Sequence, residues 1–259
     1  MIIVGISGAI SSGKSTLAET LTSFDPKHSL HLETSTIIVE LADSFNRAIL
    51  AQHANIQNDA IGTTNNILQL LLAELSLVAG QELLLTDITI QPADVSAHPE
   101  WYEKLFDYYK SLALHPELAK QSIIKENKSA YRALLQWIGG YFLYRLDDQL
   151  MWYKELRRRI ASSPQDVQFA ALTAPRQPAE AEYVRSIGGK VIVIERPELV
   201  SDRRDVTERR VLEIIPDIRV ANDGTLEQLK ACAQVLHADL LKHKLQPAYR
   251  ASDYAVAAS

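Results

Sequence analysis

The stretch GISGAISSGKST, residues 5–16, constrains the fold of this chain more than any other feature of the sequence. It holds Gly8, Gly13, Lys14 and Ser15 at the spacing G-x-x-x-x-G-K-S. An apolar run precedes it and a helical pattern follows it, which predicts a buried strand, a glycine loop and a helix. Such a loop holds nucleotide phosphates with backbone N–H groups and the positive end of the helix.

The loop predicts ATP and Mg²⁺ as the cofactors. Lys14 is expected to reach the β- and γ-phosphates, and the Ser15 hydroxyl is expected to bind Mg²⁺. The residues predicted to contact the nucleotide in this loop are Gly8, Ala9, Ser11, Ser12, Gly13, Lys14, Ser15 and Thr16. The motif indicates a triphosphate, but it does not name the acceptor of the phosphate.

Length and composition fit a globular protein with one α/β core, because the 259 residues are 47% hydrophobic and 23% charged. The net charge of -5 disfavours extended binding to nucleic acid. Cys232 is the only cysteine, so neither a disulfide framework nor a cysteine zinc site is expected. A reducing cytosol is the expected compartment.

Two apolar stretches are expected to be neither a leader nor an anchor. Residues 1–6 lack a basic region and run directly into the glycine loop, which argues against a secretion signal. Residues 67–85 are interrupted by polar side chains such as Gln69 and Glu74, so they predict a buried or amphipathic helix and no membrane span.

Five short apolar runs are predicted as strands, alternating with helices along the chain. They are residues 2–6, 29–33, 168–172, 190–195 and 218–221. This alternation predicts an α/β fold whose parallel sheet has helices on both faces. Ligands of such sheets bind at the carboxyl ends of the strands.

Residues 1–245 are expected to form one domain around this sheet. Residues 94–160 are rich in Trp, Tyr and Leu at helical spacing, which predicts a helical insertion on the acceptor side. Residues 197–213 are expected to form a lid, and residues 246–259 a flexible tail.

The helix predicted over residues 131–142 has an apolar face and a polar face. Arg132, Gln136 and Gly139 fall together on the polar face, at i, i+4 and i+7. These residues could hold a phosphate, read a base edge and let a ring approach. An ordinary amphipathic helix with a solvated polar side explains the same pattern, and the pattern alone favours that interpretation.

Three further blocks, residues 125–152, 174–197 and 206–229, follow the glycine loop in order. They contain KENKSAYRALLQWIGGYF, APRQPAEAEYVRSIGG and VANDGTLEQL. With the loop, they resemble the deoxynucleoside monophosphate kinases of bacteriophages and their bacterial relatives. The resemblance implies a three-layer P-loop nucleoside-kinase-like fold with about five strands. It also implies transfer of the ATP γ-phosphate to a (deoxy)nucleoside monophosphate.

The resemblance implies an acceptor site as well. Arg132, Gln136, Trp152 and Arg176 would line the monophosphate site, and Glu180 would hold Arg176 or the acceptor. Arginines bind phosphate oxygens bidentately, and an indole can stack on a base. A tryptophan of the hydrophobic core remains the alternative interpretation of Trp152.

Two more segments are predicted to reach the nucleotide. Arg203, Arg204 and Arg209 belong to the charged run SDRRDVTERR, and with Lys14 and Arg176 they are the predicted catalytic cations. A solvated helix with salt bridges is the alternative for this run. Asn222 is predicted to edge the adenine pocket, although residues 221–225 also suit a helix start capped by Asp223 or Thr225.

The sequence departs from the family pattern in one place. Ala174 stands where the family usually has a carboxylate just before the arginine that is Arg176 here. Asp87 and Glu33 are candidate substitutes for that carboxylate. The departure leaves two other functions open: a kinase of another acceptor, such as dephospho-coenzyme A or a modified base in DNA, and a non-catalytic nucleotide sensor. The oligomeric state is open, a homodimer included.

Overall fold

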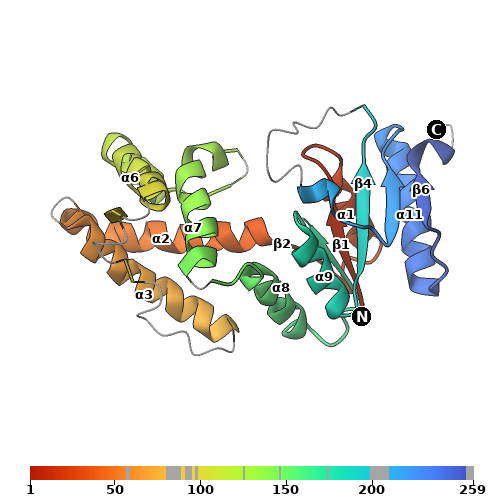
Figure 1. Ribbon diagram of the computed structural model, residues 1–259, viewed down its shortest axis with the longest axis horizontal. Coiled ribbons are helices and arrows are strands. Elements are labelled where there is room, and N and C mark those ends of the chain that lie inside the picture. The colour runs from red at the N-terminus through yellow and green to blue at the C-terminus, as the bar shows by residue number, and fades with distance from the viewer. Residues whose placement is uncertain are drawn as a thin grey trace. The chain divides into compact units, whose positions relative to one another are not determined.

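The computed structural model describes residues 1–56, 59–79, 89–90, 95–96, 99–124, 126–145, 147–173, 175–198 and 210–254. The chain divides into two compact units. Unit 1 comprises residues 1–34 and 156–259, and unit 2 comprises residues 35–155. Figure 1 shows both units and labels most of their helices and strands.

Unit 1 is built on a six-stranded sheet with the order β2-β3-β1-β4-β5-β6, in which every neighbouring pair is parallel. The strands are β1 (Ile2–Ser7), β2 (Ser29–Glu33), β3 (Phe169–Thr173), β4 (Lys190–Glu195), β5 (Ile218–Ala221) and β6 (Ala248–Arg250). The helices are α1 (Lys14–Ser23), α9 (Pro178–Ser186) and α11 (Leu226–Lys242), and a short η3 (Ala251–Asp253) follows β6. The predicted α/β class with a parallel sheet is confirmed.

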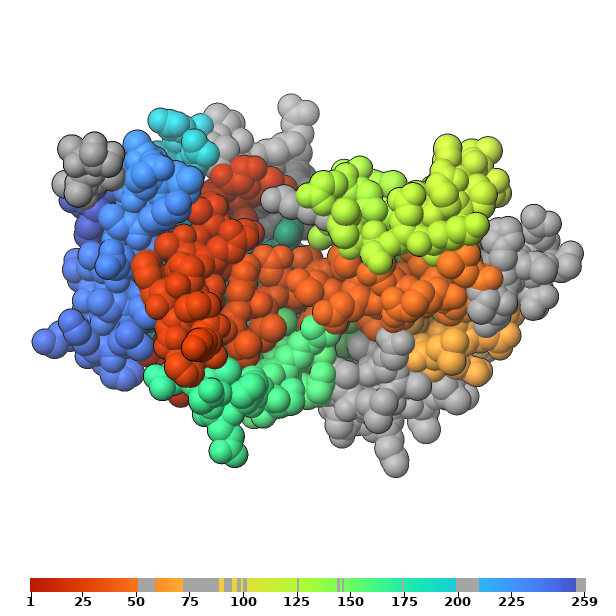
Figure 2. Space-filling model, turned by 180° about the vertical axis from the view of Figure 1, so that it is seen from behind, coloured from red at the N-terminus to blue at the C-terminus, as the bar shows by residue number. Residues whose placement is uncertain are grey.

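The alternation of side chains along β1 shows how the helices cover the sheet. Val4 and Ile6 belong to a core cluster that also contains residues of α1 and α11. Gly5 lies between them and faces the other side, where a Cβ would lie 3.1 Å from the Val184 side chain of α9. Because successive residues of a strand face opposite sides, the sheet has helices on both faces (Figure 1). On one face the neighbours are α1 and α11, and Figure 2 shows red N-terminal residues beside blue C-terminal residues.

The sheet has one strand more than predicted. β6 and η3 lie in the segment that the sequence assigns to a flexible tail, so that assignment is wrong for residues 248–253. Tyr249 pairs with Val220 of β5 and is 2% exposed, and its hydroxyl donates to Asp239 at 2.9 Å. The strand escapes sequence analysis because it is three residues long and buries a single large side chain.

Unit 2 is helical. Its helices are α2 (Thr34–Ile56), α3 (Ala60–Ala79), α6 (Pro99–Leu114), η1 (Pro116–Lys120), η2 (Lys128–Tyr131) and α7 (Arg132–Arg145), and α8 (Met151–Ala161) starts in this unit. The unit begins at residue 35, well before the predicted start of the insertion at residue 94. The reason is that α2 contributes to its aromatic core, since the ring centroids of Phe45 and Trp137 lie 5.5 Å apart. None of the helices within the described ranges is long and apolar enough to cross a membrane.

Candidate functional site

The glycine loop connects β1 to α1 and takes a shape that two of its residues can adopt only as glycine. Gly8 has a φ of 152° and Gly13 a φ of 106°, both in the region that favours glycine. A Cβ on Gly8 would lie 2.6 Å from the Ser12 Oγ, and one on Gly13 would lie 2.8 Å from the Asn222 Nδ2. The loop is therefore wrapped too tightly for side chains at these two positions.

The donors of the loop fit a phosphate group. Lys14 Nζ donates to the carbonyl oxygens of Gly8 at 2.8 Å and of Ala9 at 2.5 Å, so the ammonium group lies over the loop. The Ser12 side chain is completely buried, and its hydroxyl has no hydrogen-bond partner among the described residues. A buried polar group without a partner calls for an explanation. A phosphate at the N-terminus of α1 would supply an acceptor for these donors.

Oxygen and nitrogen atoms gather beside Ser15, in the first turn of α1. Ser15 Oγ lies 3.5 Å from Oε1 of Glu33, the last residue of β2. His31 Nε2 lies 3.3 Å from the same carboxylate oxygen and 3.1 Å from Thr173 Oγ1. Within the described part of the chain, no three His, Cys, Asp or Glu residues form a metal cage. Mg²⁺ needs no such cage, because one or two protein oxygens hold it together with substrate phosphates.

Asn222 anchors the loop from the end of β5. Its Nδ2 donates to the Ser12 carbonyl at 2.9 Å, and its backbone N–H donates to the Glu195 carbonyl at 2.7 Å. The predicted contact of Asn222 with adenine stays a prediction. The helix start after it is capped by Thr225, which forms a full capping box with Gln228.

Asp223 has a structural role instead of the predicted capping role. Its carboxylate accepts hydrogen bonds from the guanidinium of Arg250, the last residue of β6, and from Ser252 of η3. These bonds, that of Arg250 first, lower the pKa of Asp223 to about 2. Asp223 therefore ties the last strand to the loop that follows β5.

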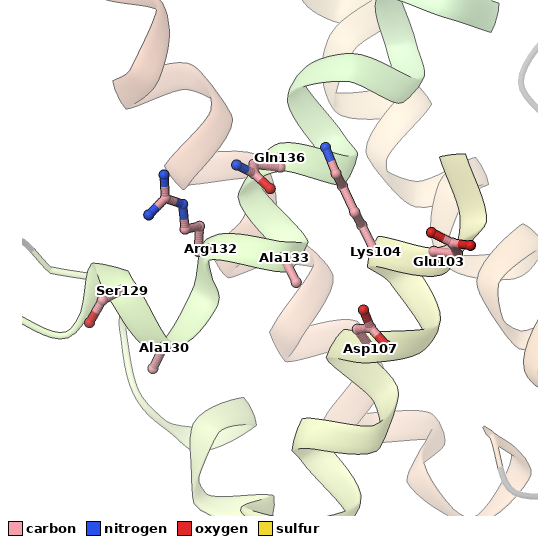
Figure 3. A pocket seen from close by; sticks show the side chains of 8 residues that line it. All are labelled: Glu103, Lys104, Asp107, Ser129, Ala130, Arg132, Ala133 and Gln136. Atoms are coloured by element: carbon pink, nitrogen blue, oxygen red, sulfur yellow. The ribbon is translucent and has the colours of Figure 1, made fainter. Parts of the chain in front are cut away.

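Unit 2 has a cavity of about 720 Å³ beside α7. Arg132 and Gln136 both line it, and both side chains are exposed. Their predicted contact with the acceptor stays a prediction. The other lining residues are Glu103, Lys104 and Asp107 of α6 together with Ser129, Ala130 and Ala133. In Figure 3 the amide of Gln136 lies between the cationic ends of Lys104 and Arg132.

The contribution of α6 to this cavity was not predicted from the sequence. The available signal was the spacing of Glu103, Lys104 and Asp107, which puts three charges on one side of an amphipathic helix.

Comparison with protein families identifies the family of this chain. The family model for deoxynucleotide monophosphate kinases matches residues 2–232. The chain belongs to the deoxynucleotide monophosphate kinase family. The match includes the glycine loop, the cavity residues of α7 and the Asn222 anchor, and it confirms the resemblance inferred from the sequence. A search of curated proteins found no match.

Two other residues expected in the acceptor site of this kinase lie together at the start of α9. The Glu180 carboxylate accepts from the Arg176 backbone N–H at 2.6 Å and from Gln177 Nε2 at 3.3 Å. Burial raises the pKa of Glu180, although these hydrogen bonds oppose the shift. Glu180 thus holds the backbone of Arg176, whose side chain is exposed. The role of both residues toward the acceptor stays a prediction.

Trp152 and Gly139 are not among the residues that line the kinase's cavity. Trp152 is 5% exposed, and its indole N–H donates to the Gly139 carbonyl at 3.0 Å. Its ring centroid lies 6.1 Å from that of Phe142, nearly edge-on. A Cβ on Gly139 would lie 3.1 Å from Ile38 Cδ1. The burial of Trp152 agrees with its alternative interpretation as a core residue. The predicted contact of Trp152 and Gly139 with the acceptor stays a prediction.

Several predicted residues of the kinase lie outside the described residues. They are the lid arginines Arg203, Arg204 and Arg209, the departure Ala174 and the candidate carboxylate Asp87. Arg210, at the end of the predicted run, donates to Gln177 Oε1 at 3.1 Å.

Proposed function

We propose that this kinase transfers the γ-phosphoryl group of ATP to a deoxynucleoside monophosphate, which gives ADP and a deoxynucleoside diphosphate. One observation carries the proposal. The Lys14 ammonium group lies on the carbonyls of a glycine loop at the N-terminus of α1, in a chain that belongs to a kinase family for this class of acceptor.

On the donor side, Lys14 and the backbone N–H groups of the loop bind the β- and γ-phosphates. Ser12 donates to a phosphate oxygen with its otherwise unpaired hydroxyl. Ser15 binds Mg²⁺, which neutralises negative charge on the phosphates when it is bound. Phosphoryl transfer depends mainly on positioning and charge stabilisation, so it needs no covalent intermediate on the protein.

On the acceptor side, the cavity of unit 2 has the groups that a nucleoside monophosphate needs. Its volume of about 720 Å³ falls within the range of small-molecule sites. Arg132 and Lys104 bind the monophosphate, and Gln136 reads the edge of the base. Asp107 keeps Lys110 as an ion-pair partner at 3.0 Å, so its charge is partly balanced within α6.

The experiment is a coupled ADP-release assay with ATP, Mg²⁺ and each common ribo- and deoxyribonucleoside monophosphate. We expect turnover with one or a few deoxynucleotides. Lys14→Ala is expected to lower that turnover by at least about 100-fold, because it removes a donor to the transferring group. Circular dichroism of Lys14→Ala checks that the variant folds.

Acceptor-side variants separate the cavity from the loop. Arg132→Ala and Lys104→Ala are expected to raise the KM for the monophosphate by about 10-fold or more, with the affinity for ATP unchanged. Lys120→Ala, an exposed lysine of η1 outside the cavity lining, is the matched control and should change neither. ATP binding without transfer to any monophosphate would refute the proposal and favour a nucleotide sensor.

A further inference from the structure

Glu33 stands where a P-loop enzyme needs a carboxylate. It ends β2, and the parallel register pairs it with Thr173, the last residue of β3. The carboxyl ends of parallel strands lie along one edge of the sheet, which is also where the glycine loop leaves β1. A carboxylate at this edge, beside the loop serine, is the usual second protein contact of the Mg²⁺ that accompanies a bound nucleotide.

The contacts around Glu33 hold its carboxylate beside Ser15. The 3.5 Å between Ser15 Oγ and Glu33 Oε1 exceeds the usual O–H···O distance, so this contact alone does not fix the carboxylate. His31 Nε2 lies 3.3 Å from Oε1 and also contacts Thr173 Oγ1 at 3.1 Å. The Glu33 side chain keeps 29% of its surface exposed, which leaves it accessible from solvent.

Three other carboxylates near this edge contact groups other than Ser15. Glu195, at the end of β4, pairs with Arg219 at 2.5 Å. Asp223, after β5, binds Arg250 and Ser252. Glu180 accepts from the Arg176 backbone.

We propose that Glu33 is the carboxylate that positions the Mg²⁺ of the ATP complex beside Ser15, directly or through a metal-bound water. The proposal rests on the proposed function for ATP binding and deepens it, because it names the residue that couples metal to nucleotide. Mg²⁺ accepts one or two carboxylates and keeps several waters, which fits a single glutamate next to a serine hydroxyl.

The proposal predicts opposite effects on two affinities. Without metal, the Glu33 carboxylate repels the phosphates of ATP, so Glu33→Gln should leave the metal-free affinity unchanged or raise it. With Mg²⁺, the same variant loses a metal contact. The factor by which Mg²⁺ tightens ATP binding should then fall by about 10-fold or more. A purely structural role of Glu33 would lower both affinities together.

The test is calorimetric titration of ATP into the full chain, once in EDTA and once in saturating Mg²⁺, with Mn²⁺ binding to the ATP complex followed by electron paramagnetic resonance. Glu33→Asp should recover part of the coupling, since it keeps the charge. Glu227→Gln, an exposed carboxylate in the first turn of α11, is the matched control and should keep the full coupling.

The outcomes separate the two proposals. If Glu33→Gln binds ATP with wild-type dependence on Mg²⁺, or weakens both affinities equally, the role of Glu33 is refuted and ATP binding stands. If the folded wild-type chain binds ATP under neither condition, the proposed function fails, and the role of Glu33 fails with it.

Discussion

The glycine loop of unit 1 and the helix α7 of unit 2, which carry the two proposed sites, present different groups to a ligand. The loop works with its backbone, and its shape depends on Gly8, Gly13 and the Asn222 anchor. In α7 the backbone groups form the hydrogen bonds of the helix itself. Only side chains, here the exposed Arg132 and Gln136, can contact a ligand. A site made by the backbone can be recognised in the sequence from a short motif. A site made by side chains on a helix has the same sequence pattern as any polar helix face.

Helix α7 also contains both residues that pack the core and residues that line the cavity. In α7 the two kinds alternate along one helix, because Trp137 and Tyr141 stack at 5.0 Å in the core while Arg132 and Gln136 line the cavity. Substitutions in unit 2 should therefore affect stability or acceptor binding according to the face they change.

The largest expected effect is at Trp152, where a variant distinguishes a residue that packs the core from one that binds substrate. Trp152→Ala removes a side chain that is 5% exposed, so we expect a loss of about 3–5 kcal/mol in unfolding free energy. Trp152→Phe keeps a ring and loses only the hydrogen bond to Gly139, a loss of about 1 kcal/mol. Urea denaturation measures both. Wild-type stability of Trp152→Ala with a strongly raised KM for the monophosphate would instead show base stacking.

The next effect tests the role of the loop backbone in ATP binding, with two glycines of unit 1. Gly13 and Gly188 both have positive φ, 106° and 83°, so alanine at either should cost about 1–2 kcal/mol. Only at Gly13 would the new Cβ meet another group, the Asn222 Nδ2 at 2.8 Å, while nothing lies within 4 Å at Gly188. ATP titration should show weaker binding by about 10-fold or more for Gly13→Ala alone. Equal ATP affinity in the two variants would contradict the backbone role of the loop.

The sequence predicts unit 1 better than unit 2 for a physical reason. Strands such as β4 are continuous apolar runs between turn residues, and the glycine loop has fixed positions, so both can be recognised locally. β6 could not be predicted, because its stability comes from Tyr249 and from the distant carboxylates Asp239 and Asp223.

The acceptor side could be predicted only in part. The pattern puts Arg132 and Gln136 on one face, but the cavity needs Lys104 from α6, and no periodicity within α7 indicates that partner. Trp152 fits both a base and a core by its residue type, and only its burial and its bond to Gly139 distinguish the two. Glu33 was one of two candidate carboxylates in the sequence, and the pairing of β2 with β3 beside α1 brings it near Ser15.

A smaller effect tests the anchor of the loop against the cap of the neighbouring helix. Asn222→Ala removes the hydrogen bond to the Ser12 carbonyl, which should lower the unfolding free energy by about 1 kcal/mol. ATP binding should weaken several-fold, which corresponds to about the same free energy. Thr225→Ala removes the capping box of α11 at a similar cost of about 1 kcal/mol. Thermal unfolding should show similar losses, and ATP titration should separate the two. Weaker ATP binding by Thr225→Ala would mean that the helix start, and not the anchor, shapes the loop.

The smallest expected effect compares two carboxylates of unit 1 whose pKa values are shifted in opposite directions. The pKa of Asp223 falls from 3.8 to about 2, mainly through the hydrogen bond from Arg250, so its contribution to stability is complete above about pH 4 and is lost as the pH falls toward 2. Burial raises the pKa of Glu180, so its contribution is present below the ordinary glutamate value and is lost as the pH rises through the raised pKa. Unfolding temperatures measured from pH 2 to 7 should therefore show two trends. At acidic pH, the difference in unfolding temperature between the wild type and Asp223→Asn should grow as the pH rises. At higher pH, the difference between the wild type and Glu180→Gln should shrink as the pH rises. Parallel curves for wild type and Asp223→Asn would mean that Arg250 and Ser252 hold β6 without help from the charge of Asp223.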